Sequence, residues 1–225
     1  MTILQRQNAQ TRRAAKAARR AAVSGSGPTP GGSEVGRNPG AIGAFGLFGE
    51  VLYLGILVTL AGLAVITLPA ALAAATQHLR RYIAAEESGI RLLGRDFVRA
   101  LPGGLAVGAG GVVVAALLAA DIVVAGSGAL PGGTVIAAVG WIGLVVLGVA
   151  LLAAARGWTA VNGWRAALSD VPQQLKNDPV GTLYLAAAVG FVGVLTWMLP
   201  PLLIPALGCA ALAAVAIPER PRRAL

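Results

Sequence analysis

The chain has 225 residues, of which 56% are hydrophobic and only 12% charged, and its net charge at pH 7 is +9. A soluble domain would usually carry about a quarter charged residues, because its surface has to face water. The mean hydropathy of +0.76 points the same way and excludes an ordinary soluble globular domain. We therefore expect an all-α, polytopic helical membrane protein whose apolar surface faces lipid.

The chain begins with a basic segment. Residues 1–40 are rich in Ala, Gly, Ser and Pro, and they carry seven basic side chains against one acidic side chain, Glu34. This composition predicts a disordered tail, and anionic lipid is one partner that it could contact. It lacks interleaved aromatic residues and a folded recognition motif, so no specific nucleic-acid partner is expected. A helical transmembrane domain should follow over residues 41–218, with a short basic tail at 219–225.

The first apolar run, residues 41–75, is interrupted by a single charged residue, Glu50. About 20 residues cross the hydrocarbon layer, so this run predicts one spanning helix at roughly residues 49–75. Pro69 has two interpretations. It could kink one long helix, or it could occupy the first turn of a new helix, which would make residues 41–75 a broken or re-entrant unit.

Residues 76–101 form an amphipathic segment between two apolar runs. After Gly89, apolar and basic side chains each recur at helical spacing: Ile90, Leu93, Phe97 and Leu101 on one face, and Arg91, Arg95 and Arg99 on another. We predict an interfacial helix here that does not span the membrane, with its arginines near anionic headgroups. The preceding His78, Arg80 and Arg81 could hold phosphate or lipid headgroups together, or could be solvated interface charges.

Four further spans are expected, at residues 105–124, 134–155, 179–199 and 202–217. The third of these should begin with Asp178 as a helix cap and Pro179 in the first turn. The paired prolines Pro200 and Pro201 should form a tight turn before the last span.

A second polar connection joins two of these spans at residues 156–181. Its apolar residues again keep helical spacing: Val161, Trp164, Leu168, Val171 and Leu175. Trp158 and Trp164 lie near arginines, which suits a helix at headgroup level, and we expect both tryptophans and Arg165 to contact headgroups or a partner. The protein should therefore have two amphipathic connecting helices.

Basic residues predict the orientation. Residues 76–104 contain five Lys or Arg, residues 156–181 contain three and the C-terminus three, whereas the turns at 126–133 and 200–201 contain none. The positive-inside rule places the charged connections and the C-terminus in the cytoplasm of a multi-pass inner-membrane protein. With five spans, which we expect, the basic N-terminal tail would then lie outside. The alternative is a re-entrant unit at residues 41–75 and a cytoplasmic tail.

Four segments resemble the YesL-like family of bacterial membrane proteins, which carry a domain of unknown function. They are VITLPAALAAAT after the first span, EESGIRLLGRDFVRAL in the first connection, DVPQQLKNDPVGTL in the second, and MLPPLLIPALGCAALAA at the final hairpin. Together they cover about residues 45–217. The family has no assigned catalytic residues, and its members often lie beside carbohydrate ABC importers. The resemblance therefore implies an accessory role in sugar uptake, with ABC transporter subunits as partners.

Few residues suggest a buried site. Asp121 is the acidic residue well inside an apolar run, so it is a candidate proton relay or ligand contact, although its place near the end of the span also allows it to reach interfacial water. Two small-residue pairs, Gly104 with Gly108 and Ala186 with Gly190, could let helices approach closely within the chain or across a homo-oligomer.

The sequence contains no catalytic triad, phosphate-binding glycine loop, carboxylate dyad or metal-ligand spacing. With one His and one Cys, we expect no metal, no cofactor and no enzymatic activity. The function favoured is an integral membrane accessory protein. The alternative is a small transporter or channel component with Asp121 in its pathway.

Overall fold

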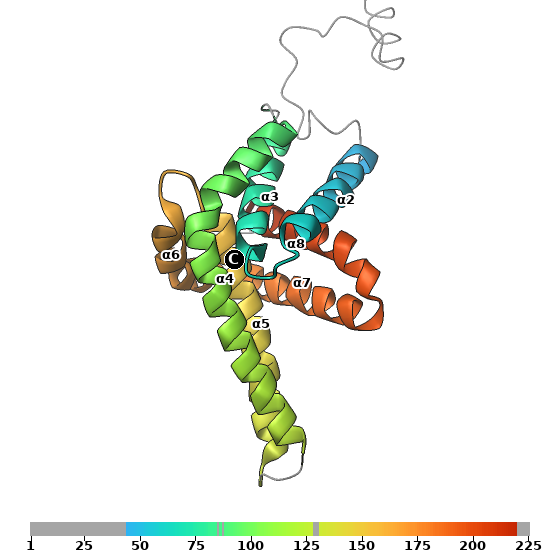
Figure 1. Ribbon diagram of the computed structural model, residues 1–225, viewed down its shortest axis with the longest axis vertical. Coiled ribbons are helices and arrows are strands. Elements are labelled where there is room, and N and C mark those ends of the chain that lie inside the picture. The colour runs from blue at the N-terminus through green and yellow to red at the C-terminus, as the bar shows by residue number, and fades with distance from the viewer. Residues whose placement is uncertain (1–43, 85, 87, 128–130, 220–225) are drawn as a thin grey trace, which may run out of the picture. The chain divides into compact units, whose positions relative to one another are not determined.

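The computed structural model describes residues 44–84, 86, 88–127 and 131–219. They contain helices and no strand, which confirms the all-α class, and they belong to one compact unit, Arg37–Leu225. The predicted tails, 1–40 and 219–225, lie outside the described residues apart from Glu219. The helices, shown in Figure 1, are α2 (Ala44–Ala61), α3 (Leu68–Ile83), α4 (Ile90–Gly126), α5 (Gly133–Gly157), α6 (Gly163–Asn177), α7 (Pro179–Met198), the 3-10 turn η1 (Pro200–Leu202) and α8 (Leu203–Glu219).

The described part of the chain has four helices that are long and apolar enough to cross a membrane. They are α4, α5, α7 and the segment Pro200–Pro218, which contains η1 and α8. A polytopic helical membrane protein is therefore confirmed. The helix α2 is apolar but shorter, and α3 is not among the four.

The expected single span at residues 49–75 is wrong, because the chain turns within it. The helix α2 ends at Ala61, and α3 begins at Leu68 with Pro69 in its first turn. Proline lacks an N–H and is tolerated there, so the second interpretation of Pro69 is correct. The Thr67 hydroxyl donates to the Ala61 carbonyl at 2.6 Å and closes the turn.

The helix α3 lies at the centre of the unit, in contact with α2, α4, α5 and α8 (Figure 1). Every residue from Pro69 to Thr76 is buried, and so are His78 and Leu79. Half of these residues are alanines, whose small side chains allow several helices to approach one axis. The prediction of an interfacial position is therefore wrong for Thr76, His78 and Leu79, which are buried in the core, while residues 80–83 are half-buried.

The predicted interfacial helix after Gly89 is not separate from the next span. The helix α4 runs unbroken from Ile90 to Gly126 and includes Pro102. Proline removes one helical hydrogen bond and can be tolerated where neighbouring groups support the helix. The α4 helix then pairs with α5 in the long hairpin seen in Figure 1.

Glycines mark the closest helix approaches. A methyl group at Gly55 would overlap the Ile204 carbonyl, and one at Gly208 would overlap the Val51 carbonyl, so α2 and α8 cross backbone to backbone. Sequence reasoning missed this crossing.

The two predicted small-residue pairs have different outcomes. Gly104 and Gly108 are buried against Ala70 and Ile66, so this pair packs within the chain. Ala186 is half-buried, and a methyl group at Gly190 would meet nothing within 4 Å. The second pair therefore makes no close crossing among the described residues.

Candidate functional site

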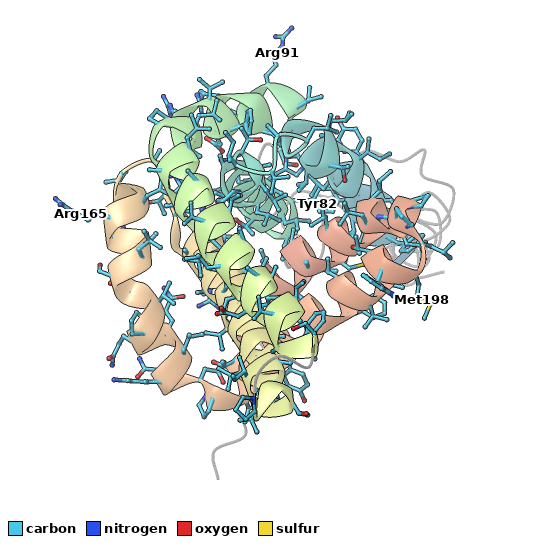
Figure 2. The ribbon with its side chains drawn as sticks, turned by 60° about the horizontal axis from the view of Figure 1, so that its bottom comes forward. Tyr82, Arg91, Arg165 and Met198 are labelled. Carbon is cyan, nitrogen blue, oxygen red and sulfur yellow. The ribbon has the colours of Figure 1, made fainter. Side chains whose placement is uncertain are left out.

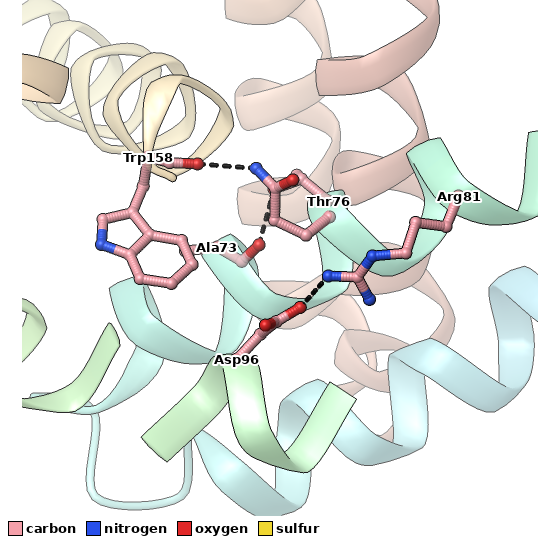
Figure 3. Close-up of polar contacts among 6 residues, drawn as sticks. Ala73, Thr76, Arg81, Asp96 and Trp158 are labelled. Carbon is pink, nitrogen blue, oxygen red and sulfur yellow. Dashed lines mark hydrogen bonds and ion pairs between the residues drawn. The ribbon is translucent and has the colours of Figure 1, made fainter. Parts of the chain in front are cut away.

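The last turns of α3 carry polar side chains that reach three other segments, and we call these residues the polar hub (Figure 3). The Thr76 hydroxyl donates to the Ala73 carbonyl of its own helix at 2.9 Å, as Figure 3 shows, and lies 3.3 Å from the Ala155 carbonyl of α5. Gln77 Nε2 donates to the Trp158 carbonyl at 2.6 Å. His78 bonds Glu50 of α2, and Arg81 pairs with Asp96 of α4. Three faces of α3 are thus tied to their neighbours by polar contacts.

His78 is the most deeply buried titratable residue of the hub, with 1% of its surface exposed. Its Nε2 lies 2.7 Å from Glu50 Oε1, while Nδ1 is buried without a hydrogen-bond partner. The predicted headgroup contact at His78 is therefore wrong, because the side chain is enclosed by protein. Burial and the nearby Glu50 carboxylate raise the pKa of Tyr82.

Arg81 and Asp96 form an ion pair between α3 and α4 (Figure 3). The Asp96 side chain is 6% exposed and that of Arg81 22% exposed, so Arg81 is mainly a structural partner. The expected headgroup contact at Arg81 gains no support, because Nη2 pairs with Asp96 and Nη1 is buried without a hydrogen-bond partner. Arg80 is half-buried beside them.

Sequence reasoning missed Asp96, although a signal was present. This carboxylate lies three residues after Leu93 and next to Phe97, on the apolar face of the predicted helix. A lone charge on an apolar face requires a partner, and an arginine is the usual one. The partner could not be identified because Arg81 lies on another helix.

The first three turns of α4 expose a row of arginines. We call Arg91, Arg95 and Arg99 the arginine stripe; all three are exposed and make no ion pair with a described residue. The opposite face holds Asp96 and Ala100, which are buried. Figure 2 shows Arg91 pointing away from the helices.

The predicted arginine face is confirmed as exposed. The predicted apolar face is confirmed only in part, because Leu93, Phe97 and Leu101 are half-buried whereas Ile90 is 57% exposed. Lipid contact stays a prediction.

Both tryptophans of the second connection are buried, contrary to the headgroup prediction. Trp158 is 2% exposed and Trp164 7%, with ring centroids 6.3 Å apart. Trp164 Nε1 donates to the Ala100 carbonyl at 2.7 Å. A methyl group at Gly103 would lie 2.5 Å from the Trp164 ring, so this glycine makes room for the indole.

The rest of the second connection is a helix, α6, as expected, but its buried face differs from the prediction. Trp164, Ala167 and Val171 are buried, whereas Leu168 is 43% exposed and Val161 92% exposed. Arg165 is exposed and points outward in Figure 2.

Asp121 is exposed on α4, and it lines neither the cavity where α5, α6 and α7 meet nor the cavity between α2, α3 and α4. Residues 100–120, between Arg99 and Asp121, carry no charged side chain. At 1.5 Å per residue this run is about 30 Å long, which is the thickness of the hydrocarbon layer. Asp121 therefore suits the end of a span rather than its middle, and the pathway hypothesis gains no support.

The described residues contain no group of three His, Cys, Asp or Glu side chains placed to hold a metal ion. No protein-family model, curated protein or solved structure matches the chain. The resemblance to the YesL-like family therefore stays a prediction.

Proposed function

We propose that the protein is a non-catalytic membrane component that binds anionic lipid headgroups through the arginine stripe and serves as an accessory subunit of a larger transport assembly. The observation that carries the lipid part is the exposure of Arg91, Arg95 and Arg99 on one face of α4, directly before an uncharged run of membrane length. Each arginine near an anionic surface contributes about 1 kcal/mol of attraction.

The length of α4 supports this position for the stripe. Its 37 residues extend about 56 Å, nearly twice the hydrocarbon thickness of about 30 Å. If Ala100 to Ala120 occupies the hydrocarbon, the preceding turns extend into the headgroup layer and beyond it. The guanidinium groups are then at the depth of lipid phosphates, with which they form paired hydrogen bonds.

The break between α2 and α3 supports the re-entrant topology. A hairpin of α2 and α3 begins and ends on the same side, and four crossings by α4, α5, α7 and α8 return the chain to that side. The stripe, Arg165 and both basic tails then share one side of the membrane, which the positive-inside rule identifies as the cytoplasm. Reporter fusions at residue 30 and at the C-terminus should both give cytoplasmic signals. An external signal at residue 30 would contradict this topology.

Lipid binding can be tested in nanodiscs. The full chain should unfold at a higher temperature in phosphatidylglycerol than in phosphatidylcholine, and R91Q/R95Q/R99Q should lose most of that difference. Among single variants, Arg95→Gln should reduce the difference more than Lys176→Gln, which also removes one exposed positive charge but lies on α6. If the triple variant keeps the same preference for phosphatidylglycerol, the arginine stripe is not the lipid-binding site.

The accessory role rests on the family resemblance and needs its own test. Purification of the chain from its native membrane in mild detergent should recover permease and ATPase subunits of a carbohydrate ABC importer. The same purification with the triple stripe variant, expressed at the same level, tests whether the arginine stripe also contacts the partner subunits. If this chain is recovered alone at every detergent strength, the proposed association with importer subunits is wrong.

A further inference from the structure

A polar cavity of about 160 Å³ lies where α5 and α6 end and α7 begins. Its polar wall consists of Arg156, Gln174, Asn177, Asp178 and Thr182, and apolar residues of α5, α7 and α8 complete it. The volume corresponds to roughly five water molecules, which is enough for a tetrahedral oxyanion. Neither the stripe nor the polar hub lines this cavity.

Local sequence explains why these side chains converge. Asp178 caps α7 as predicted, because its Oδ1 accepts from the Gly181 N–H at 2.9 Å while Pro179 occupies the first turn. The Thr182 hydroxyl donates back to the Asp178 carbonyl at 2.9 Å. The junction between α6 and α7 is therefore rigid, and it fixes Asn177 and Asp178 opposite Arg156 at the end of α5.

Hydrogen-bond donors remain on the cavity wall. Arg156 Nη2 donates to Gln174 Oε1, which leaves other guanidinium N–H groups and directs the Gln174 amide nitrogen elsewhere. Asn177 Oδ1 accepts from Gln173 Nε2 at 3.2 Å, so the Asn177 amide nitrogen is also left as a donor. None of the hydrogen bonds found among the described residues uses these two amide nitrogens.

The electrostatics favour an anion. Arg156 lies within range of two other charges, Arg80 on α3 and Asp178. On the cavity wall itself, the positive charge of Arg156 faces the negative charge of Asp178, while Arg80 lies near Arg156 without lining the cavity. The positive end of the 20-residue helix α7 adds to the positive side. The Asp178 carboxylate opposes an anion, but its Oδ1 already accepts the helix-cap hydrogen bond.

We propose that this cavity binds a phosphate group, either as free inorganic phosphate or as the phosphate of a lipid headgroup. Arg156 supplies the charge-assisted hydrogen bonds, and the amides of Gln174 and Asn177 supply neutral donors. The site lies beyond the lipid-binding role proposed for the stripe, because it uses different helices and a cavity instead of an exposed face.

The test uses the full chain in neutral detergent, titrated with inorganic phosphate by calorimetry, and native mass spectrometry of bound phosphatidylglycerol. Arg156→Gln should weaken affinity by about tenfold or more, because it removes a charged donor from the anion. Asp178→Asn should tighten binding, since asparagine keeps the helix cap but removes the opposing charge. Lys176→Gln, an exposed change nearby, should alter affinity by less than about twofold.

The outcomes separate the sources of the phosphate. Saturable phosphate binding that Arg156→Gln weakens identifies the free ion, whereas phosphatidylglycerol retention alone that Arg156→Gln weakens identifies a headgroup. Binding of neither probe, or equal binding by the wild type and Arg156→Gln, overturns the proposal. The triple stripe variant has an intact cavity and should keep phosphate binding. The proposal of lipid binding by the stripe and the proposal of phosphate binding in the cavity can therefore fail independently.

Arg156 also bonds Gln174, so circular dichroism and elution profiles must show that each variant folds. Should Arg156→Gln not fold, Arg156→Lys and Asp178→Asn decide the question. The lysine variant keeps the charge but loses the planar fork, and it should bind with intermediate affinity. Asp178→Asn that binds no more tightly than the wild type would then overturn the proposal.

Discussion

The centre of this protein is largely apolar, as in a soluble domain, but its periphery is apolar as well. The buried part of helix α3 contains five alanines together with Thr76 and His78, whereas the distal halves of α4 and α5 expose large aliphatic residues such as Leu117 and Val139. Large apolar side chains are stable on the outside only if the surrounding solvent is itself apolar. The core is therefore held by apolar packing, close backbone approach and a few polar contacts, and the apolar periphery by lipid.

The largest effect should come from breaking the closest backbone approach. Gly55→Leu would force a side chain into the carbonyl of Ile204, and it should destabilise the fold by about 3 kcal/mol or more, measured by unfolding in detergent. Gly49→Leu is the matched control on the same helix, since nothing lies within 4 Å of that position. If both variants lose a similar amount of unfolding free energy, the loss comes from leucine in α2 in general and not from the close approach of α2 to α8.

The polar core should show the next largest effect. Asp96→Ala leaves Arg81 without its partner, which should cost about 2 to 3 kcal/mol, because a removed partner strands a largely desolvated charge. The double variant R81L/D96L should recover most of that loss in the same unfolding measurement. A double variant no more stable than Asp96→Ala would mean that the hub depends on the charges themselves.

A smaller effect is expected at the buried indole. Trp164→Phe keeps an aromatic ring but removes the hydrogen bond to Ala100, so the free energy of unfolding should fall by about 1 kcal/mol. Trp141→Phe is the control, because Trp141 is 58% exposed on α5. Equal changes in the two variants would count against the assigned hydrogen bond.

The smallest effect is expected on the lipid-facing surface. Leu117 is 63% exposed, and Leu117→Ala should change the free energy of unfolding by no more than about 0.5 kcal/mol. Leu54→Ala, at a site that is 0% exposed, should cost about 2 kcal/mol or more in the same assay. If the two variants lose comparable amounts of unfolding free energy, core and periphery do not differ in what their side chains contribute to stability.

Features encoded by continuous segments could be predicted from the sequence. The expected spans at 134–155 and 179–199 correspond to α5 and α7 within two residues, because each is a long uncharged run with a clear boundary. The Asp178 cap with Pro179 was also predicted correctly, since both residues act on their own helix.

Features that depend on distant partners could not be predicted. The segment around His78 has the polarity of a surface helix, and only Glu50 and Asp96, on two other helices, make its burial possible. Trp164 has the usual signature of a membrane interface, but Gly103, on α4, leaves a space for its ring. Helical periodicity reports the faces of a single helix and not the identity of the helix that covers them.

The crossing of α2 with α8 has a consequence for how the protein is made. These are the first and last described helices in chain order, so α2 leaves the ribosome long before the segment that covers it is synthesised. Until then, the backbone of α2 around Val51 and Gly55 lacks the helix that covers it in the folded protein. Assembly is therefore completed from the C-terminus, and chains truncated before α8 should be exposed to membrane quality-control proteases at their N-terminal end.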